Sequence, residues 1–201
     1  MQWPKIKIPE KLEPFKGVIL FAVILMGSNF FWKYNILGDE GFSLTSTVTF
    51  WGFDISAPFS WMAKHVAHVS VAILNFIGSD VILKPGNIFK HTTGYSVQIV
   101  WACTGMKQMY IFFCIIAFYR GPWLKKLWFI PLGLMIVYLF NIFRITFIIG
   151  VVEQHPEWFH FLHIVAFKYA FYLIIFLMWV LWEEKIAGKR VKKNTHQVEV
   201  L

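Results

Sequence analysis

Three side chains that could take part in covalent chemistry lie near the ends of three different apolar stretches: Cys103, Arg144 and His163. A thiolate can attack a peptide carbonyl, an imidazole can transfer protons, and a fixed guanidinium can stabilise the oxyanion that develops. These residue types together are suited to acyl transfer on a peptide. A charged side chain deep in a bilayer costs about 2.5–3.5 kcal/mol on insertion scales, so Arg144 must face protein, water or lipid headgroups.

Each side chain also has an ordinary structural interpretation. A buried cysteine is often only a small apolar residue, and an arginine near a helix end commonly reaches the membrane interface. His163 lies close to Trp158, and both residue types suit that interface. Chemistry becomes the better interpretation only if the three residues share one depth in a membrane, and the surrounding elements decide this.

The composition predicts an integral membrane protein of one domain. Hydrophobic residues make up 58% and aromatic residues 19% of the 201 residues, and the mean hydropathy is +0.59. A soluble domain of this length would have too few polar residues to cover so many hydrophobic ones. The net charge of +8 is concentrated beside apolar stretches and not along one surface, so we expect no nucleic-acid partner. Motifs of metal or cofactor sites are missing, and we predict neither a metal nor a cofactor.

The apolar stretches predict an all-α, polytopic transmembrane bundle of about four to five spans. The first, residues 17–32, is predicted to be a retained helix and not a cleaved signal peptide. Residues 103–119, 127–151 and 159–182 each approach or exceed the length that crosses about 30 Å of hydrocarbon. Residues 61–77 are only moderately apolar, so we expect a helix lying in the interface, although a crossing there stays open.

Two segments have strand character. Residues 45–56, "TSTVTFWGFDIS", are rich in β-branched and aromatic side chains. Residues 80–100 predict two short strands around a turn at Pro85 and Gly86. We expect this short hairpin to lie outside the cytoplasm, just ahead of Cys103.

Positive charge predicts the orientation, because basic residues next to spans stay in the cytoplasm. Arg120, Lys125 and Lys126 place the loop after residues 103–119 inside, and a basic tail places the C-terminus inside. The single membrane domain, residues 1–201, then has four parts. They are a cytoplasmic N-terminus (1–16), an extracytoplasmic or interfacial region (33–100), a three-helix core with the candidate site (101–182) and a basic cytoplasmic tail (183–201).

With this orientation, Cys103, Arg144 and His163 all fall at the outer ends of their helices. Arg144 lies about 26 Å from the inner end of its helix at a rise of about 1.5 Å per residue. Asn141, one turn earlier on the same face, is expected to orient the guanidinium or to bond a neighbouring helix. Lys168 lies about one and a half turns beyond His163 and either pairs with the site or reaches the interface.

The two cysteines differ in their surroundings. Cys103 stands in "WACTGMK" at a predicted helix start, and Lys107 four residues on would favour the thiolate from the same helical face. Cys114 lies in mid-span among phenylalanines and isoleucines, so we expect it to be structural. At about 16 Å along one helix, the two cysteines are too far apart for a disulfide.

These residues carry a resemblance to the exosortase/archaeosortase family. The chain has "ACTG" at the start of one span, ending at Gly105, "NxxR" at Asn141 and Arg144 late in the next, and His163 at the start of the last. The resemblance covers roughly residues 94–182. The closing "FLHIVAFKYAFYLIIFLMWVLW" is most similar to short members from Bacteroidetes-type bacteria.

The resemblance implies a cysteine protease or transpeptidase in the bacterial cytoplasmic (inner) membrane, with its site on the outer face. Its substrates would be exported proteins with a C-terminal motif, a transmembrane helix and a basic tail. The new C-terminus would pass to a lipid or a surface glycan. Cys103 would be the nucleophile, Arg144 the stabiliser of substrate or oxyanion, and His163 the proton carrier, with Gly105, Lys107 and Asn141 in supporting positions.

Two departures from the family pattern keep alternatives open. The chain is shorter than many members and has fewer N-terminal spans. The stretch between Arg144 and His163 is also short, which leaves His160, and then His155, as alternative bases. A non-enzymatic membrane assembly or scaffolding factor on the same bundle is the alternative function.

Overall fold

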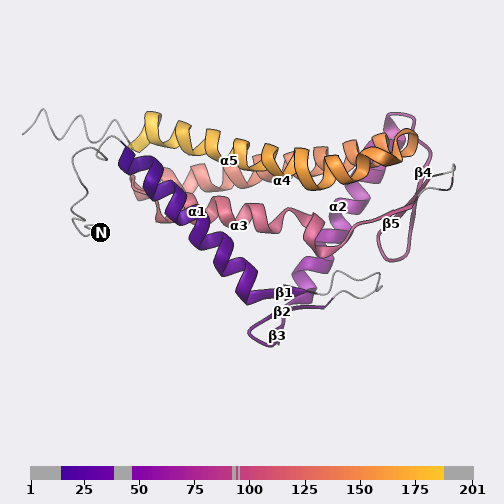
Figure 1. Ribbon diagram of the computed structural model, residues 1–201, viewed down its shortest axis with the longest axis horizontal. Helices are drawn as coiled ribbons and strands as arrows, with labels where there is room; N and C mark the ends of the chain where they lie inside the picture. The colour runs from indigo at the N-terminus through magenta and orange to yellow at the C-terminus, as the bar shows by residue number, and fades with distance from the viewer. Residues whose placement is uncertain (1–14, 39–46, 92–93, 95, 188–201) are drawn as a thin grey trace, which may run out of the picture.

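The computed structural model describes residues 15–38, 47–91, 94 and 96–187. Nearly all of the predicted cytoplasmic N-terminus and most of the predicted basic tail lie outside these ranges. The described part is mostly helical, with one small sheet at an end of the helical bundle and another below its middle (Figure 1). The predicted mainly helical architecture is therefore confirmed.

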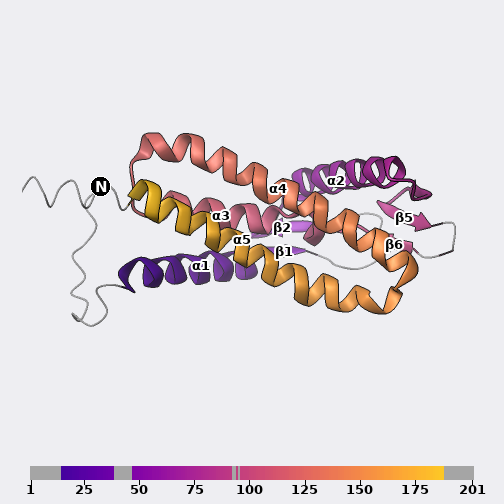
Figure 2. The same ribbon diagram turned by 90° about the horizontal axis from the view of Figure 1, so that it is seen from above.

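Among the described residues, five α-helices form the body of the molecule. They are α1 (Lys16–Asn35), α2 (Ser56–Phe76), α3 (Met106–Phe118), α4 (Trp123–Gln154) and α5 (Phe167–Trp182). Short 3-10 turns at Trp101–Thr104 and Pro156–Trp158 and π-helical segments at Phe161–Ala166 and Glu183–Ala187 extend them. In two views α3, α4 and α5 run along the long axis of the molecule, with α1 inclined against them (Figures 1 and 2).

Within the described residues, three helical stretches are long and apolar enough to cross a membrane: Lys16–Asn35, Trp123–Gln154 and Pro156–Ala187. The predicted span 103–119 is shorter than expected, because α3 has only 13 residues, or about 20 Å. It cannot start at Cys103, since Gly105 has a left-handed backbone (φ 77°) that ends helical continuity there. α2 is steeply inclined to the bundle and is not among the candidate spans (Figure 1).

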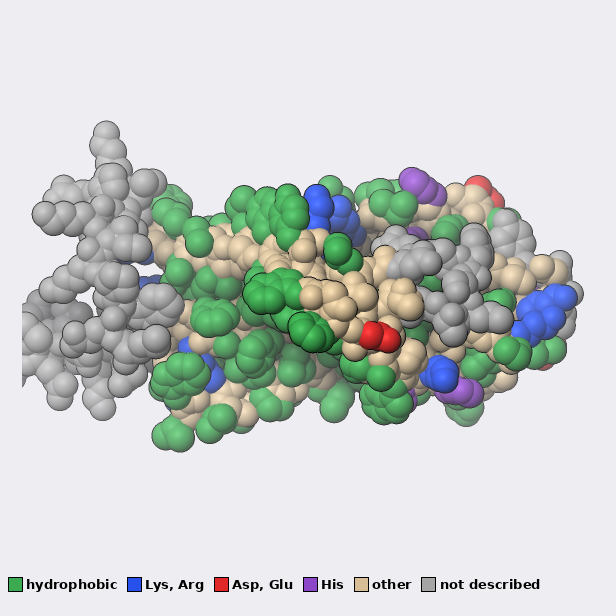
Figure 3. Space-filling view, turned by 90° about the horizontal axis from the view of Figure 1, so that it is seen from below, with side chains coloured by type: hydrophobic (Ala, Val, Ile, Leu, Met, Phe, Trp, Pro, Cys, Tyr) green, Lys and Arg blue, Asp and Glu red, His purple; other side chains and the backbone are tan. Residues whose placement is uncertain are grey.

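Large apolar side chains cover the outside of the bundle. Leu139 and Phe143 of α4 and Leu173 of α5 are each more than half exposed. Figure 3 shows hydrophobic side chains spread over the visible face along the helices, with charged side chains few and scattered there. Such a surface is stable in lipid and would be an association liability in water.

Two three-stranded antiparallel sheets follow α1 and α2, and their strands lie in sequence order. The first contains β1 (Ile36–Gly38), β2 (Val48–Phe50) and β3 (Phe53–Asp54), and the second contains β4 (Val81–Lys84), β5 (Ile88–His91) and β6 (Ser96–Gln98). The strand character of residues 45–56 and the hairpin at Pro85 and Gly86 are confirmed. The third strand, β6, was not predicted.

The sheets attach the inclined helices to the segment around Cys103. Trp101 packs with Trp32 of α1, Val48 of β2 and Phe59 of α2 in one buried cluster. Its indole lies so close to Gly38 that a Cβ placed there would be 2.4 Å from the ring. Trp101, two residues before Cys103, is therefore fixed by contacts with α1, β2 and α2.

The second sheet is attached to the end of α4 by a polar contact. His91 of β5 is fully buried, and its Nδ1 lies 3.1 Å from Oε2 of Glu153. The hydroxyl of Ser79 donates to the same carboxylate oxygen at 3.3 Å. This connection fixes β4 to β6 beside the half of α4 that carries Arg144.

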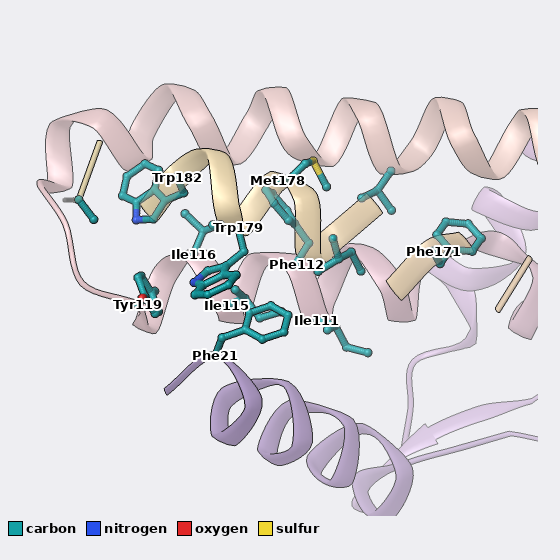
Figure 4. Packing of buried hydrophobic residues seen from close by; sticks show 13 residues of the cluster. Phe21, Ile111, Phe112, Ile115, Ile116, Tyr119, Phe171, Met178, Trp179 and Trp182 are labelled. Atoms are coloured by element: carbon teal, nitrogen blue, oxygen red, sulfur yellow. The ribbon is translucent and has the colours of Figure 1, made fainter. Parts of the chain in front are cut away.

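The main core lies at the other end of the bundle (Figure 4). Phe21 of α1 packs on Trp179 of α5 with ring centroids 4.6 Å apart. The indole N–H of Trp182 donates to the carbonyl of Arg120 at 2.9 Å, and Arg120 forms an ion pair with Glu183. These contacts gather the end of α5 and the loop between α3 and α4.

Lys126 completes this end of the bundle. Its buried ammonium donates to the carbonyls of Ala117 at 2.8 Å and Tyr119 at 2.6 Å. A cation that satisfies the last carbonyls of a helix also interacts favourably with the negative end of the helix dipole. The short α3 therefore has a well-defined end against α4.

We predict that Gly133→Ala destabilises the bundle, because a Cβ on Gly133 would lie 2.0 Å from Cζ of the buried Phe112 ring. Overpacking of this kind costs about 1–3 kcal/mol. The matched control is Gly150→Ala in the same helix, where the Cβ would meet Leu74 at an ordinary 3.7 Å. Thermal unfolding of both purified variants in detergent measures the difference, and equal melting temperatures would contradict the packing described.

Candidate active site

Cys103 lies in a short turn whose geometry is held by local hydrogen bonds. Its N–H donates to the carbonyl of Val100 at 2.9 Å. The hydroxyl of Thr104 donates to the carbonyl of Trp101 at 2.7 Å and accepts the N–H of Met106 at 3.4 Å. The turn is thus tied both to the preceding strand segment and to the first residue of α3.

Gly105 allows this turn to lie directly against α4. Its φ of 77° is a left-handed backbone conformation that residues other than glycine rarely adopt. A Cβ on Gly105 would also lie 2.8 Å from Cγ of Asn141. At this close approach the Nδ2 of Asn141 donates to the carbonyl of Cys103 at 3.0 Å.

This bond agrees with the second of the two roles that the sequence left open for Asn141, a hydrogen bond to a neighbouring helical segment. The sequence suggested that Asn141 orients the guanidinium of Arg144 or bonds a neighbouring helix. In the described structure no hydrogen bond joins Asn141 to Arg144, and the amide holds the turn of Cys103 instead. The reason is the missing side chain at Gly105, which brings a backbone carbonyl within reach of the amide.

The structure brings His163 to Cys103. Nε2 of His163 lies 3.7 Å from Sγ of Cys103, within hydrogen-bonding reach of sulfur. His163 belongs to the π-helical segment Phe161–Ala166, and its ring stacks on Phe159 at 5.3 Å between centroids. Short π-helical segments inside helices are frequent at functional sites.

The two alternative histidines lie elsewhere. His155 contacts Glu157 at 3.1 Å, and both side chains are exposed. His160 is also exposed. Of the three histidines, His163 is the one whose ring contacts the thiol, although its role in proton transfer stays a prediction.

Arg144 is a buried cation next to this pair. Its side chain is buried, and it interacts electrostatically with Cys103. Its Nη2 donates to the carbonyl of His163 at 3.4 Å, and its guanidinium lies 5.7 Å from the ring centre of Phe171. No carboxylate pairs with it among the described residues, and its buried Nε has no hydrogen-bond partner there. The guanidinium is therefore available to an anion.

Lys107 does not lie where the sequence suggested. The prediction placed it on the same helical face as Cys103, but the left-handed Gly105 separates the turn of Cys103 from α3. Lys107 instead interacts electrostatically with Lys33 of α1 and Lys168 of α5. Arg144, and not Lys107, is the cation with an electrostatic contribution from Cys103.

The thiol and the imidazole line a cavity of about 20 Å³. Its remaining walls come from β6 and the residue after it, from α4, and from Phe159. A cavity of this volume holds about one water molecule and no peptide. A substrate therefore needs the walls to move apart, and the hollow of about 500 Å³ between α2 and α4 does not contain the three residues.

The sequence did not indicate three parts of this arrangement: β6, the π-helical segment and Phe159. β6 has three residues, and its position beside Cys103 depends on tertiary contacts. The π-helical segment is likewise set by packing against α4. Phe159 carried a usable signal, because it lies four residues before His163 and thus on the same helical face.

The geometry can support nucleophilic chemistry. A thiol with a base in reach and a fixed cation beside it is the arrangement of an activated cysteine nucleophile.

Among known proteins, a model of the family described as transmembrane exosortase matches residues 17–181. No curated protein and no solved structure matches the chain. The matched range contains every element of the site, and the resemblance predicted from the motifs is confirmed.

We predict that Asn141→Leu destabilises the protein by about 1–3 kcal/mol, because the buried carbonyl of Cys103 loses its donor. The matched control in the same helix is Thr146→Val, since the Oγ1 of Thr146 is buried without a hydrogen-bond partner in the described structure. Unfolding of both variants in detergent tests this expectation. If Thr146→Val lost as much stability as Asn141→Leu, the hydrogen bond donated by the Asn141 side chain would make no specific contribution to stability.

Proposed function

Because this chain belongs to the transmembrane exosortase family, we propose that it is a membrane-embedded cysteine transpeptidase. It would cleave C-terminal sorting signals of exported proteins and transfer them to a cell-surface acceptor. The observation that carries this proposal is the 3.7 Å contact between Sγ of Cys103 and Nε2 of His163, beside the buried guanidinium of Arg144.

The first half of the reaction forms a thioester. His163 takes the thiol proton at Nε2, and the thiolate of Cys103 attacks the carbonyl carbon of the scissile peptide bond. Arg144 stabilises the negative charge on the carbonyl oxygen, because a guanidinium stays protonated. The carbon–nitrogen bond then breaks, and the imidazolium gives its proton to the leaving amine.

The second half releases the product. An amine or hydroxyl of the acceptor, a lipid or a surface glycan, gives its proton to His163 and attacks the thioester carbon. Arg144 again stabilises the oxyanion, the carbon–sulfur bond breaks, and the leaving thiolate takes the proton back from His163, which restores the thiol of Cys103 and the neutral imidazole. Water in place of the acceptor would give hydrolysis by the same steps.

The edge of β6 supports a mode of substrate binding. Among the described strands β6 pairs only with β5, and its other edge is therefore available for pairing. Val97 and Gln98 of this strand line the cavity with Cys103 and His163. An extended peptide that adds to such an edge gains main-chain hydrogen bonds. Its carbonyls would then pass close to the thiol.

The distribution of charge supports a site on the outer face. The loop carrying Arg120 contacts the end of α5, and a Cβ on Gly17 of α1 would lie 2.8 Å from the Tyr119 hydroxyl. The start of α1, the basic loop after α3 and the end of α5 therefore gather at one end of the bundle. Arg144 is 21 residues beyond the start of α4, or about 30 Å from it. The cytoplasm would face the basic end.

This orientation gives four crossings and two cytoplasmic termini. α1, α4 and the stretch containing α5 are the three candidate spans, and α3 with the turn before it would make the fourth crossing. α2 would lie in the outer interface, which its inclination to the bundle supports (Figure 1). The membrane would be the bacterial cytoplasmic membrane.

One observation favours a second candidate function. The cavity at Cys103 is too small for a peptide in the described conformation. A protein that never binds a peptide there would have the same small cavity. A non-enzymatic membrane assembly factor would use the same bundle without needing the thiol. The next two experiments separate the functions.

We predict that Cys103→Ala abolishes processing of an exported substrate with a C-terminal motif, one span and a basic tail. The variant should fold, because only one buried sulfur is removed. Cys114→Ala is the control and should process the substrate at the wild-type rate, since Cys114 lies in α3 away from His163. Processing is measured in cells by loss of a C-terminal tag. Undiminished processing by Cys103→Ala would exclude this mechanism.

When the walls of the cavity move apart, as binding of a substrate requires, a membrane-impermeant maleimide applied from outside should label Cys103 and spare Cys114. The two single-cysteine variants, each with the other cysteine replaced by alanine, separate the signals. His163→Ala should slow labelling of Cys103 at neutral pH by tenfold or more, because the base that removes the thiol proton is lost. Faster labelling from the cytoplasmic side, or a rate independent of His163, would contradict the proposed orientation or the proposed base.

A further inference from the structure

Three lysines from three helices converge beside the site. They are Lys33 in the last turn of α1, Lys107 in the first turn of α3 and Lys168 in the first turn of α5. Lys107 lies one turn before Ile111 and Lys168 lies one turn before Phe171, and these two apolar residues pack in one buried cluster. Both lysines therefore extend from the same face and level of neighbouring helices.

Lys33 joins them through the packing of α1 on α3. Its neighbour Trp32 stacks near Tyr110, with ring centroids 5.3 Å apart, and Tyr110 lies one turn after Lys107. Lys107 interacts electrostatically with both other lysines. Three ammonium groups brought together in this way repel one another unless an anion lies between them.

The described structure supplies no such anion. None of its carboxylates pairs with Lys33, Lys107 or Lys168, and its ion pairs lie elsewhere. The cluster is therefore an excess of positive charge where an anionic group would bind.

An apolar groove begins next to the lysines. It lies between α1 and α3, encloses about 450 Å³, and runs from Phe31 and Tyr110 to Ile24 and Phe118. From Tyr110 to Phe118 the groove follows α3 for about 12 Å. Phe31 and Tyr110 stack with ring centroids 6.2 Å apart at the end that faces the lysines. One end of the groove is thus cationic, and its length is apolar.

We propose that this groove binds a resident anionic phospholipid. The phosphate accepts hydrogen bonds from the ammonium groups of Lys33, Lys107 and Lys168, and one acyl chain lies in the groove between α1 and α3. The charge at one end and the apolar length together match a lipid and not a peptide. This inference stands on the lysines and the groove and does not depend on the proposed function.

The position of the headgroup links the lipid to the site. Lys107 follows Cys103 by four residues, and Lys168 follows His163 by five. A bound phosphate would hold the first turns of α3 and α5 at a fixed separation. The lipid would therefore steady the two segments that carry the thiol and the imidazole.

Native mass spectrometry of the full chain in detergent, with added phosphatidylglycerol, tests the headgroup contact. The double substitution Lys107→Ala and Lys168→Ala should weaken binding at least tenfold. The matched control, Lys84→Ala with Lys90→Ala, removes two exposed lysines of the second sheet and should leave binding unchanged. Equal losses in the two double variants would overturn the proposal, because they would indicate unspecific charge attraction.

Gly27→Leu tests the groove without removing charge. A Cβ on Gly27 meets nothing within 4 Å, so the leucine can fill the groove without straining the fold. Phosphatidylglycerol binding should fall at least tenfold while the melting temperature stays at that of the wild type. Gly150→Leu places the same side chain in the other hollow, between α2 and α4, and should leave binding intact. Unchanged binding by Gly27→Leu would overturn the acyl-chain site.

Two further ligands separate the sources of a bound phosphate. Diacylglycerol with the same chains should bind at least tenfold more weakly than phosphatidylglycerol, because it lacks the phosphate. Inorganic phosphate at millimolar concentration should displace the lipid only partly, because it lacks the chains. Equal binding of diacylglycerol, or binding of inorganic phosphate as tight as that of the lipid, would overturn the proposal.

Discussion

The close approach of Gly105 to Asn141 is the constraint on which the site depends. A left-handed glycine without a Cβ lets the turn of Cys103 lie against α4, and the amide of Asn141 fixes it by its carbonyl. Arg144 follows Asn141 by three residues, so it lies on the same helical face one turn further along. The spacing of these two α4 residues therefore has a physical meaning. The first holds the backbone of Cys103, and the second interacts electrostatically with its thiol.

Two electron-rich groups lie against the guanidinium of Arg144, and no carboxylate among the described residues pairs with it. The carbonyl of His163 accepts one of its N–H groups, and the face of Phe171 lies under the guanidinium. A paired carboxylate would neutralise the cation and leave it unable to stabilise an oxyanion. A carbonyl and an aromatic ring offset part of the burial cost and keep the charge available. The same carbonyl contact fixes the backbone of His163 relative to α4.

The sequence predicted those parts that depend on long apolar runs and on residue chemistry. Hydropathy identified α1, α4 and the last helix, and residue type together with charge-derived depth selected Cys103, Arg144 and His163. The sequence did not predict where α3 begins, because the left-handed conformation of Gly105 depends on packing against Asn141. The predicted position of Lys107 was wrong for the same reason. Spacing alone also cannot separate His163 from His155 and His160. That choice is made in three dimensions, where the π-helical segment turns one ring toward the thiol.

The small cavity at Cys103 is consistent with the chemistry of transfer. A thioester that forms in an open site meets water at high concentration, and hydrolysis would compete with transfer to an acceptor. A cavity for about one water molecule shields the thiol, and under the proposed function a substrate would have to displace the walls. We expect the short edge strand β6 and the π-helical segment to move first, because each has weaker backbone pairing than α4 behind them. Substrate binding would then supply the free energy that opens the cavity. During this opening, the contact of Gly105 with Asn141 would keep the proposed nucleophile in place, and the contact of Arg144 with Phe171 would keep the cation in place.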